Sequence, residues 1–158
     1  MKKQKGFSLI ELLIVVAIIL IIAAIAIPNL LRSRMAANEA SAVGSLRTIN
    51  TAEVTFATTY PAQGFAAGLT NLGGAAPCGP ATALTACLID EVLSVTAKKS
   101  GYNFLAVGTG ALPMVSYTAT AVPTLLGSSG QRAFFTDQSG VIRYDTTGAG
   151  ATATSPAL

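Results

Sequence analysis

The sequence contains no histidine among its 158 residues. Hydrolytic triads, zinc-protease motifs and proton shuttles that work near neutral pH depend on imidazole, so these chemistries are excluded. Two cysteines, Cys78 and Cys87, are too few for a four-cysteine zinc site or an iron-sulfur cluster. No GxSxG, Walker-type or GxGxxG pattern is present. We therefore expect no catalytic residues, no bound metal and no cofactor.

Charged residues are also scarce, at 11% of the chain, and the net charge of +3 has a local origin. Lys2, Lys3 and Lys5 lie in the first five residues, and without them seven basic residues balance seven acidic ones. A phosphate-binding surface needs clustered Lys and Arg, whereas the remaining basic residues are scattered. No direct binding to nucleic acid is predicted.

Apolar residues are abundant, at 51% of the chain, and many of them form one run. The run is unbroken from Leu12 to Ile27, and the uncharged window extends to Leu31. At about 1.5 Å per residue, a helix of about twenty residues spans about 30 Å, which is the thickness of a bilayer's hydrocarbon core. The sequence predicts a membrane-spanning helix within residues 7–31.

Three interpretations of this segment compete. A cleavable signal peptide would use residues 1–5 as its basic start and Ala24-Ile25-Ala26 as its cleavage site, but the flanking residues stay apolar where a polar break is expected. A lipoprotein needs a cysteine soon after the apolar run, and the first one is Cys78. A bare membrane anchor is the third, although lysines before the run and Arg32 and Arg34 after it give little indication of orientation.

The string Lys5-Gly6-Phe7-Ser8-Leu9-Ile10-Glu11-Leu12-Leu13 separates these interpretations. A carboxylate next to an apolar run lies near or inside the bilayer, where a charge is unfavourable, so Glu11 either marks the headgroup boundary or has a partner. On this string the sequence resembles the type IV prepilin family, which includes the pseudopilins of type II secretion. The resemblance is strongest over residues 1–60.

The resemblance implies a processing route. A prepilin peptidase would remove the leader, residues 1–6, by cutting after Gly6 on the cytoplasmic side, and the new amino terminus on Phe7 would be methylated. The apolar helix of residues 7–31 would be retained, first in the inner membrane and then in the core of an extracellular filament. Glu11 would attract the charged amino terminus of a neighbouring subunit. The implied partners are copies of the chain, the peptidase and an inner-membrane assembly platform.

Pro28 lies near the end of the apolar run. Proline removes a backbone donor and clashes with the preceding helical turn, so we expect a kink or a locally unwound stretch around residues 24–28. The family resemblance implies the same.

Residues 32–60 continue with helical periodicity. One face carries larger apolar side chains and should pack on a sheet: Met35, Ala42, Leu46, Ile49, Phe56 and Tyr60. The opposite face is small and uncharged, and either contacts neighbouring subunits or is solvated: Ala37, Ser41, Gly44, Thr48, Thr51 and Thr55. Glu39 and Glu53 fall within the apolar stripe and should seek cations among Lys98, Lys99, Arg132 and Arg143, either in the same chain or in the next subunit.

The remainder predicts a small head, residues 61–145. Pro61 ends the helix, and residues 61–87 form a loop rich in Gly, Ala and Pro. Outside the cytoplasm Cys78 and Cys87 would form a disulfide. A short helical turn, residues 88–93, precedes strands expected at 102–107, 114–122, 131–136 and 141–145. Residues 146–158 offer little to bury and are expected to be a flexible tail.

The predicted fold class is α+β and pilin-like, with a long amino-terminal helix packed on an antiparallel sheet of about four strands. The predicted function is that of a structural subunit of a type IV pilus, serving adhesion, motility or DNA uptake. One alternative is a major pseudopilin of type II secretion, although the carboxylates Asp137 and Asp145 do not form a calcium-ligand cluster. An alternative of another class is a secreted binding or adhesion module released by signal peptidase.

Overall fold

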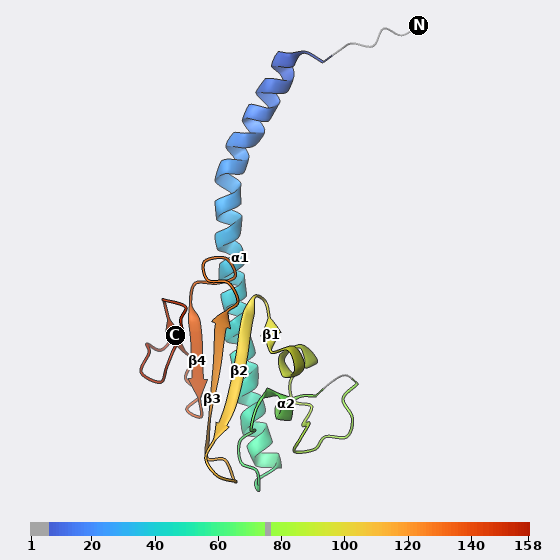
Figure 1. Cartoon of the computed structure of the whole chain (residues 1–158), viewed down its shortest axis with the longest axis vertical. Helices are drawn as coiled ribbons and strands as arrows, with labels where there is room; N and C mark the ends of the chain where they lie inside the picture. Colours follow the sequence, from blue (N-terminus) through green and yellow to red (C-terminus); the bar gives the residue numbers. More distant parts are fainter. Residues whose placement is uncertain (1–6, 75–76) are drawn as a thin grey trace. The chain divides into compact units, whose positions relative to one another are not determined.

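The computed structural model describes residues 7–74 and 77–158. The chain divides into two compact units between Arg34 and Met35. A single helix, α1 (Leu9–Thr59), runs through both units (Figure 1). The remaining elements belong to the second unit, so the predicted combination of a long amino-terminal helix and a small α+β head is confirmed.

Helix α1 is continuous across Pro28, which lies inside it. The unwound stretch expected around residues 24–28 is therefore absent, although Pro28 cannot donate the backbone hydrogen bond that the other interior residues donate. The kink stays a prediction. The helix ends at Thr59, two residues before Pro61, where the sequence places its end.

The second unit, Met35–Leu158, is called the head from here on and is built around the carboxyl-terminal half of α1 and one sheet. The sheet has five antiparallel strands in sequential order: β1 (Lys98–Lys99), β2 (Tyr102–Thr109), β3 (Ser116–Pro123), β4 (Ala133–Asp137) and β5 (Arg143–Asp145). Four match the expected strands. The fifth, β1, has only two residues, which is too short for an alternating pattern to reveal.

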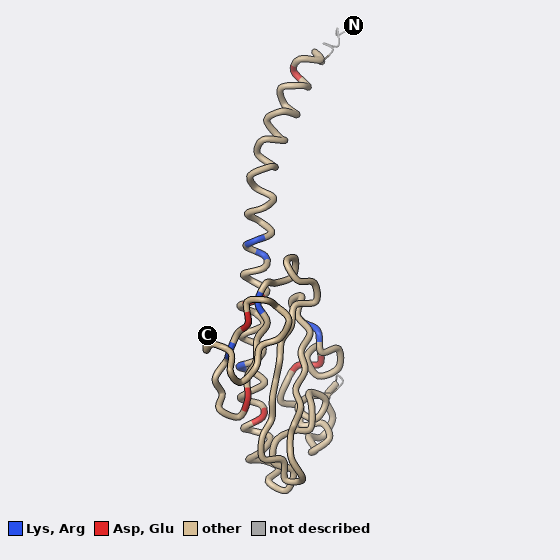
Figure 2. The backbone as a smooth tube through the Cα atoms, turned by 60° about the vertical axis from the view of Figure 1, so that its left-hand side comes forward, with Lys and Arg blue, Asp and Glu red and all other residues tan. Residues whose placement is uncertain are grey.

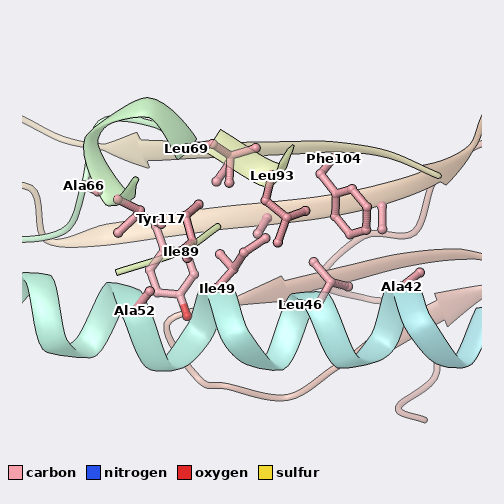
Figure 3. Close-up of a cluster of buried hydrophobic side chains, with 14 of the residues drawn as sticks. Ala42, Leu46, Ile49, Ala52, Ala66, Leu69, Ile89, Leu93, Phe104 and Tyr117 are labelled. Atoms are coloured by element: carbon pink, nitrogen blue, oxygen red, sulfur yellow. The ribbon is translucent and has the colours of Figure 1, made fainter. Parts of the chain in front are cut away.

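The core lies between α1 and the sheet (Figure 3). From α1, the expected residues Ala42, Leu46, Ile49 and Phe56 are buried. From β3, Tyr117, Ala119 and Ala121 are buried, as strand alternation predicts. The same alternation predicts Val115 on this face, but Val115 precedes the strand and is 74% exposed. The apolar face of α1 and the apolar face of β3 therefore belong to one core.

The connection between α1 and the sheet is more structured than its composition predicts. It contains a four-residue helix, α2 (Leu69–Leu72), which buries Leu69 and Leu72. The helical turn expected at residues 88–93 occurs slightly later, as a π-helical turn, η1 (Val92–Thr96). The expected disulfide between Cys78 and Cys87 is present.

The last residues pack back on the molecule, which differs from the flexible tail expected for residues 146–158. The backbone N–H of Tyr144 donates to the carbonyl of Pro156, and that of Leu158 donates to the carbonyl of Ile142. Ala151 is buried. Backbone groups and one small side chain make these contacts, so composition alone does not reveal them.

Candidate functional site

The amino-terminal end of α1 holds the first set of predicted site residues. Gly6 lies outside the described residues. Phe7 is 76% exposed, and Glu11 lies in the first turn of the helix. The backbone N–H of Ser8 donates to Oε2 of Glu11 at 2.9 Å, which is one half of a capping box. Glu11 is therefore held close to the beginning of the helix, where the N–H groups of the first turn favour a negative charge.

The surface of α1 from Leu12 to Leu31 is largely apolar and uncovered. The large side chains from Leu12 to Leu31 are all exposed, and no charged residue lies between Glu11 and Arg32 (Figure 2). By length and composition this helix can cross a membrane. An apolar surface of this extent is normally covered by lipid or by protein.

The small-residue face of α1 lies in the second unit. Ala37, Gly44, Thr48, Thr51 and Thr55 are exposed, whereas Ser41 is half-buried and donates from its hydroxyl to that of Ser100 at 2.8 Å. The surroundings of Gly44 are open, since a methyl group at this position would have no described atom within 4 Å beyond its own helix backbone. The face carries no charge, so both expected interpretations, packing and solvation, stay open.

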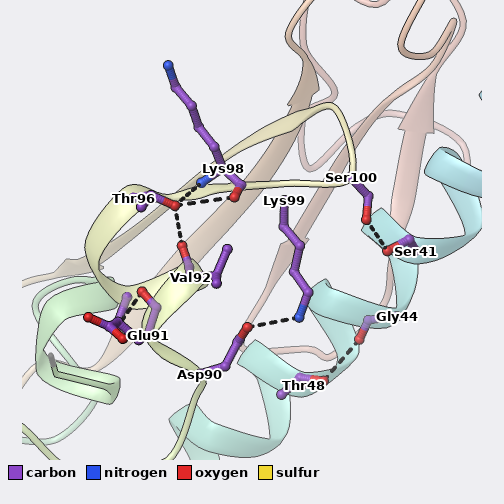
Figure 4. Close-up of polar contacts among 11 residues, drawn as sticks. Ser41, Gly44, Thr48, Asp90, Glu91, Val92, Thr96, Lys98, Lys99 and Ser100 are labelled. Atoms are coloured by element: carbon purple, nitrogen blue, oxygen red, sulfur yellow. Dashed lines mark hydrogen bonds and ion pairs between the residues drawn. The ribbon is translucent and has the colours of Figure 1, made fainter. Parts of the chain in front are cut away.

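Threonine hydroxyls on this face bond within the helix itself. Thr48 donates to the carbonyl of Gly44 at 3.2 Å (Figure 4). Thr51 donates to Arg47 and Thr55 to Thr51 in the same way, at 3.0 and 2.8 Å. Because these donors already have acceptors, another protein can cover the face without leaving a buried hydroxyl unsatisfied.

Glu39 links α1 to the segment before β4. Its Oε1 accepts the backbone N–H groups of Gln131 and Arg132 at 2.9 and 3.1 Å, and its Oε2 accepts Nε of Arg132 at 2.8 Å. Burial alone would raise the pKa of Glu39, but these backbone donors and the Arg132 guanidinium together lower it below 4.5. The prediction that Glu39 finds a cation among four candidates is thus met by Arg132.

Arg132 is held from two further sides. Its guanidinium carbon lies 5.6 Å from the ring centres of both Phe134 and Tyr144. These cation–π contacts fix the donor that Glu39 uses. No sequence pattern indicates this arrangement, because the two rings come from different strands, β4 and β5.

Glu53 has a different environment. It is completely buried, and its Oε2 accepts the backbone N–H of Ala66 at 2.8 Å. Its Oε1 has no hydrogen-bond partner among the described residues. Burial raises the pKa of Glu53 to about 7, although the Ala66 N–H acts in the opposite direction. The expected cation is absent from its contacts in the described part of the chain.

The other cations proposed as partners lie elsewhere. Lys99 pairs with Asp90 at 3.0 Å, and Lys98 is exposed (Figure 4). Arg143 donates from Nη1 to the carbonyl of Ser155 at 2.9 Å. Within residues 7–74 and 77–158, no group of three or more His, Cys, Asp or Glu side chains is arranged to hold a metal ion.

A polar link that the sequence did not indicate joins α1 to the sheet. The side-chain amide of Asn50 donates to the hydroxyl of Thr136 at 3.0 Å, and Tyr117 donates from its hydroxyl to Oδ1 of Asn50 at 3.0 Å. The one available signal was the position of Asn50, next to the buried Ile49 on the helix face that packs on the sheet.

The cysteines lie in the connection that contains α2. Their Cα atoms are 6.0 Å apart in the disulfide. The residues on either side of the loop are held by backbone bonds, in which Ala86 donates to Asn71 and Leu88 donates to Leu72. The disulfide therefore closes a surface loop whose base is packed on α2.

Comparison with known proteins finds one family motif, at the amino-terminal end of the chain, and short matches to two pilus proteins. The prokaryotic N-terminal methylation motif matches residues 1–27. The chain is 64% identical over 39 residues to the type IV wide pilus major component PilA4 of Thermus thermophilus, which covers 25% of this chain and 30% of that protein. It is 46% identical over 54 residues to the type IV major pilin protein PilA of Myxococcus xanthus, which covers 34% of this chain and 24% of that protein.

The matched region thus spans less than a third of the length of each of these relatives. No solved structure matches the chain. Both relatives are named as pilus proteins and not as enzymes, in agreement with the predicted prepilin resemblance and with the prediction of a structural protein.

Proposed function

We propose that the chain is a structural subunit of a type IV pilus, made as a prepilin, anchored in the inner membrane by α1 and assembled into an extracellular filament. The observation that carries the proposal is the methylation motif over residues 1–27, which includes the first part of α1, together with the exposure of the large apolar side chains of this helix from Leu12 to Leu31. The similarity to two type IV pilus proteins supports the same function.

Processing would change the charge at the beginning of the helix. Cleavage after Gly6 by a prepilin peptidase removes Lys2, Lys3 and Lys5 and leaves an amino group on Phe7, which methylation keeps basic. The mature amino terminus then begins four residues before Glu11. Since Ser8 holds the Glu11 carboxylate at the first turn, the two opposite charges lie at the same end of the helix.

Assembly would follow from the cost of isolated charges in an apolar surrounding. An ammonium and a carboxylate that lack partners are each unfavourable in hydrocarbon, and pairing between neighbouring chains reduces both penalties. The pair would also fix the position of one subunit along the next. The exposed apolar side chains of α1 would exchange lipid contacts for contacts with other α1 helices in the filament core.

The head would then lie at the outer surface of the filament and carry its contacts with surfaces or cells. The pilus is favoured over the pseudopilus of type II secretion because both relatives are described as type IV pilus components. An assembly platform in the inner membrane is the expected partner before the subunit enters the filament.

Amino-terminal sequencing and mass spectrometry of the mature protein test this function. We expect a chain that starts with N-methylated Phe7. A mature chain that starts at Ile27 would instead support a secreted module released by signal peptidase and would overturn the proposal.

A processing variant provides the control. Gly6→Val should leave the leader attached and the chain in the membrane, whereas Gln4→Ala in the same leader should be processed normally. Electron microscopy of surface filaments, with identification of the subunit by mass spectrometry, separates a pilus from a periplasmic pseudopilus.

A further inference from the structure

Glu53 is a carboxyl group that the proposed filament function does not use. It lies on the face of α1 that packs on the sheet, and its exposed fraction is 0%. Within residues 7–74 and 77–158, one donor reaches it, the backbone N–H of Ala66, while Oε1 is buried without a partner. A buried carboxyl with a single neutral donor is poorly suited to carry a charge.

The neighbouring described elements supply no compensating charge. One turn away on α1, positions 49, 50, 56 and 57 are uncharged. On β3 the titratable neighbour is Tyr117; burial and the carboxyl groups of Glu53 and Asp137 raise the pKa of this tyrosine to about 12, so it stays neutral. The segment that contains Ala66 carries no charged residue from Pro61 to Leu72.

The segment Gln63–Gly68, here called the docking segment, covers Glu53 and is fixed on the side opposite α1. Phe65 donates its N–H to the carbonyl of Met114 at 3.1 Å, and Met114 donates to the carbonyl of Gln63 at 2.7 Å. Gly108 of β2 donates to the carbonyl of Ala67 at 3.3 Å. The docking segment is therefore held between the sheet and Glu53.

The approach of the docking segment to the sheet is close. A methyl group at Gly108 would lie 2.5 Å from the carbonyl oxygen of Ala66, so only glycine fits there. Ala66 itself is completely buried. Water therefore reaches Oε1 of Glu53 only if the docking segment moves away from α1.

We propose that Glu53 is a proton-binding site that couples pH to the docking of segment Gln63–Gly68 on α1. With the proton bound, the neutral carboxyl stays in the core and the docking segment stays in place. When the proton is lost, the carboxylate needs hydration, and the segment opens to admit water. The inference concerns the head alone and does not depend on filament assembly.

Proton binding to Glu53 favours the closed position of the docking segment. The pKa of Glu53 is about 7 in the folded head, against an ordinary value of 4.5. The closed state therefore binds the proton more tightly than the open state, and closure weakens as pH rises from about 4.5 to about 7 and then levels off.

Hydrogen exchange of the full-length chain in detergent micelles tests the proposal. After correction for the intrinsic pH dependence of exchange, protection of the docking segment should fall by about tenfold between pH 6 and pH 8.5. Glu53→Gln, which keeps the shape and removes the titration, should change by less than about twofold over the same range. Glu39→Gln, at the paired carboxylate, should retain the wild-type pH dependence.

The carboxyl ¹³C resonance of Glu53, measured in the wild-type chain, gives a second readout that does not require the variant to fold. It should titrate near neutrality. An ionised Glu53 at pH 6, or equal pH dependence of protection in wild type and Glu53→Gln, would overturn the proposal.

Discussion

Three carboxylates on one helix show how far surroundings decide what a residue does. Glu11 accepts a backbone N–H at the start of α1, Glu39 is paired with Arg132, and Glu53 is buried with a single neutral donor. Their side chains are identical, yet the charged form is favoured at Glu39 and disfavoured at Glu53. Each therefore supports a different prediction.

Replacement of Glu11 tests the assembly pair. Glu11→Gln keeps an oxygen that can accept the Ser8 N–H but removes the charge. We expect normal cleavage after Gly6 and a loss of surface filaments of at least about tenfold, because the amino terminus of a neighbouring subunit loses its partner. Filament yield by shearing and immunoblot is the measurement. Glu91→Gln, at an exposed carboxylate of the head, is the matched control, and wild-type yield in both variants would contradict the assembly role.

Replacement of Glu39 tests the link between α1 and β4. Glu39→Gln should lower the free energy of unfolding at pH 7 by about 1–2 kcal/mol, because charge-assisted hydrogen bonds to Arg132 and Gln131 are weakened. The pKa of Glu39 is lowered in the folded chain, so its stabilisation is present above 4.5 and is lost as pH falls below that value. Urea unfolding in micelles at pH 7 and at pH 3 measures this. A difference between wild type and variant that is as large at pH 3 would refute the ionic contribution.

The elements of the head differ in how well the sequence predicts them. The buried face of α1 and the alternation in β3 follow from apolar periods that extend over several turns or residues. The two-residue strand β1 and the single turn α2 are too short to show a period. The packing of residues 146–158 depends on backbone bonds to Ile142 and Tyr144 and on a bond from the Arg143 side chain to the carbonyl of Ser155, and no periodic pattern indicates these contacts.

The candidate site divides in the same way. Gly6, Phe7 and Glu11 stand in one short motif of the sequence, and their roles stay predictions, whereas the disulfide is predictable because the chain has only two cysteines. The sequence restricts the partner of Glu39 to a few cations but does not choose among them. It cannot indicate the partner of Glu53, which is a backbone N–H brought close only by the folded connection.

The small-residue face of α1 gives a prediction for the helix as an element. Thr48→Glu places a charge in the middle of that face, next to Gly44. If neighbouring subunits cover the face, filament yield should fall by about tenfold or more, since a buried unpaired charge is strongly unfavourable. Thr58→Glu, near the end of the helix and exposed, controls for charge. Unimpaired assembly of the Thr48→Glu variant would identify the face as solvated.

The disulfide gives a prediction for the connection. Its cysteines are nine residues apart, and closing a loop of this length stabilises the fold by about 2.5–3 kcal/mol when the loss of chain entropy in the unfolded state is the main effect. Cys78→Ser with Cys87→Ser should lower the free energy of unfolding by that amount, and a reducing agent should affect the wild type alone. Urea unfolding measures both. An equal effect of reductant on the double variant would show that it acts elsewhere.

At the scale of the whole molecule, the two units differ in what stabilises them. The head has its own core, whereas the apolar window of α1 that is long enough to cross a membrane buries nothing. In the proposed function, the first unit would be surrounded by lipid or by other subunits, whereas the second would not need them to fold.

A chain that begins at Met35 tests this independence. We expect it to be soluble without detergent and to unfold cooperatively, because every residue of the core cluster lies after position 34. Circular dichroism and urea unfolding are the measurements, and the full-length chain in micelles is the reference. Aggregation, or the lack of a cooperative transition, would show that the head needs the first unit.

The threonines of α1 that donate to carbonyls of their own helix affect how easily contacts on this face can form and break again. Such a face loses few hydrogen bonds when a neighbour excludes water from it and gains few when water returns, so hydrogen bonding contributes little to the free-energy difference between the two states. In a subunit of the proposed kind, the small-residue face of α1 would be exposed to water when the subunit leaves the filament and buried again when it returns. Contacts of this type would favour a subunit that can be used more than once.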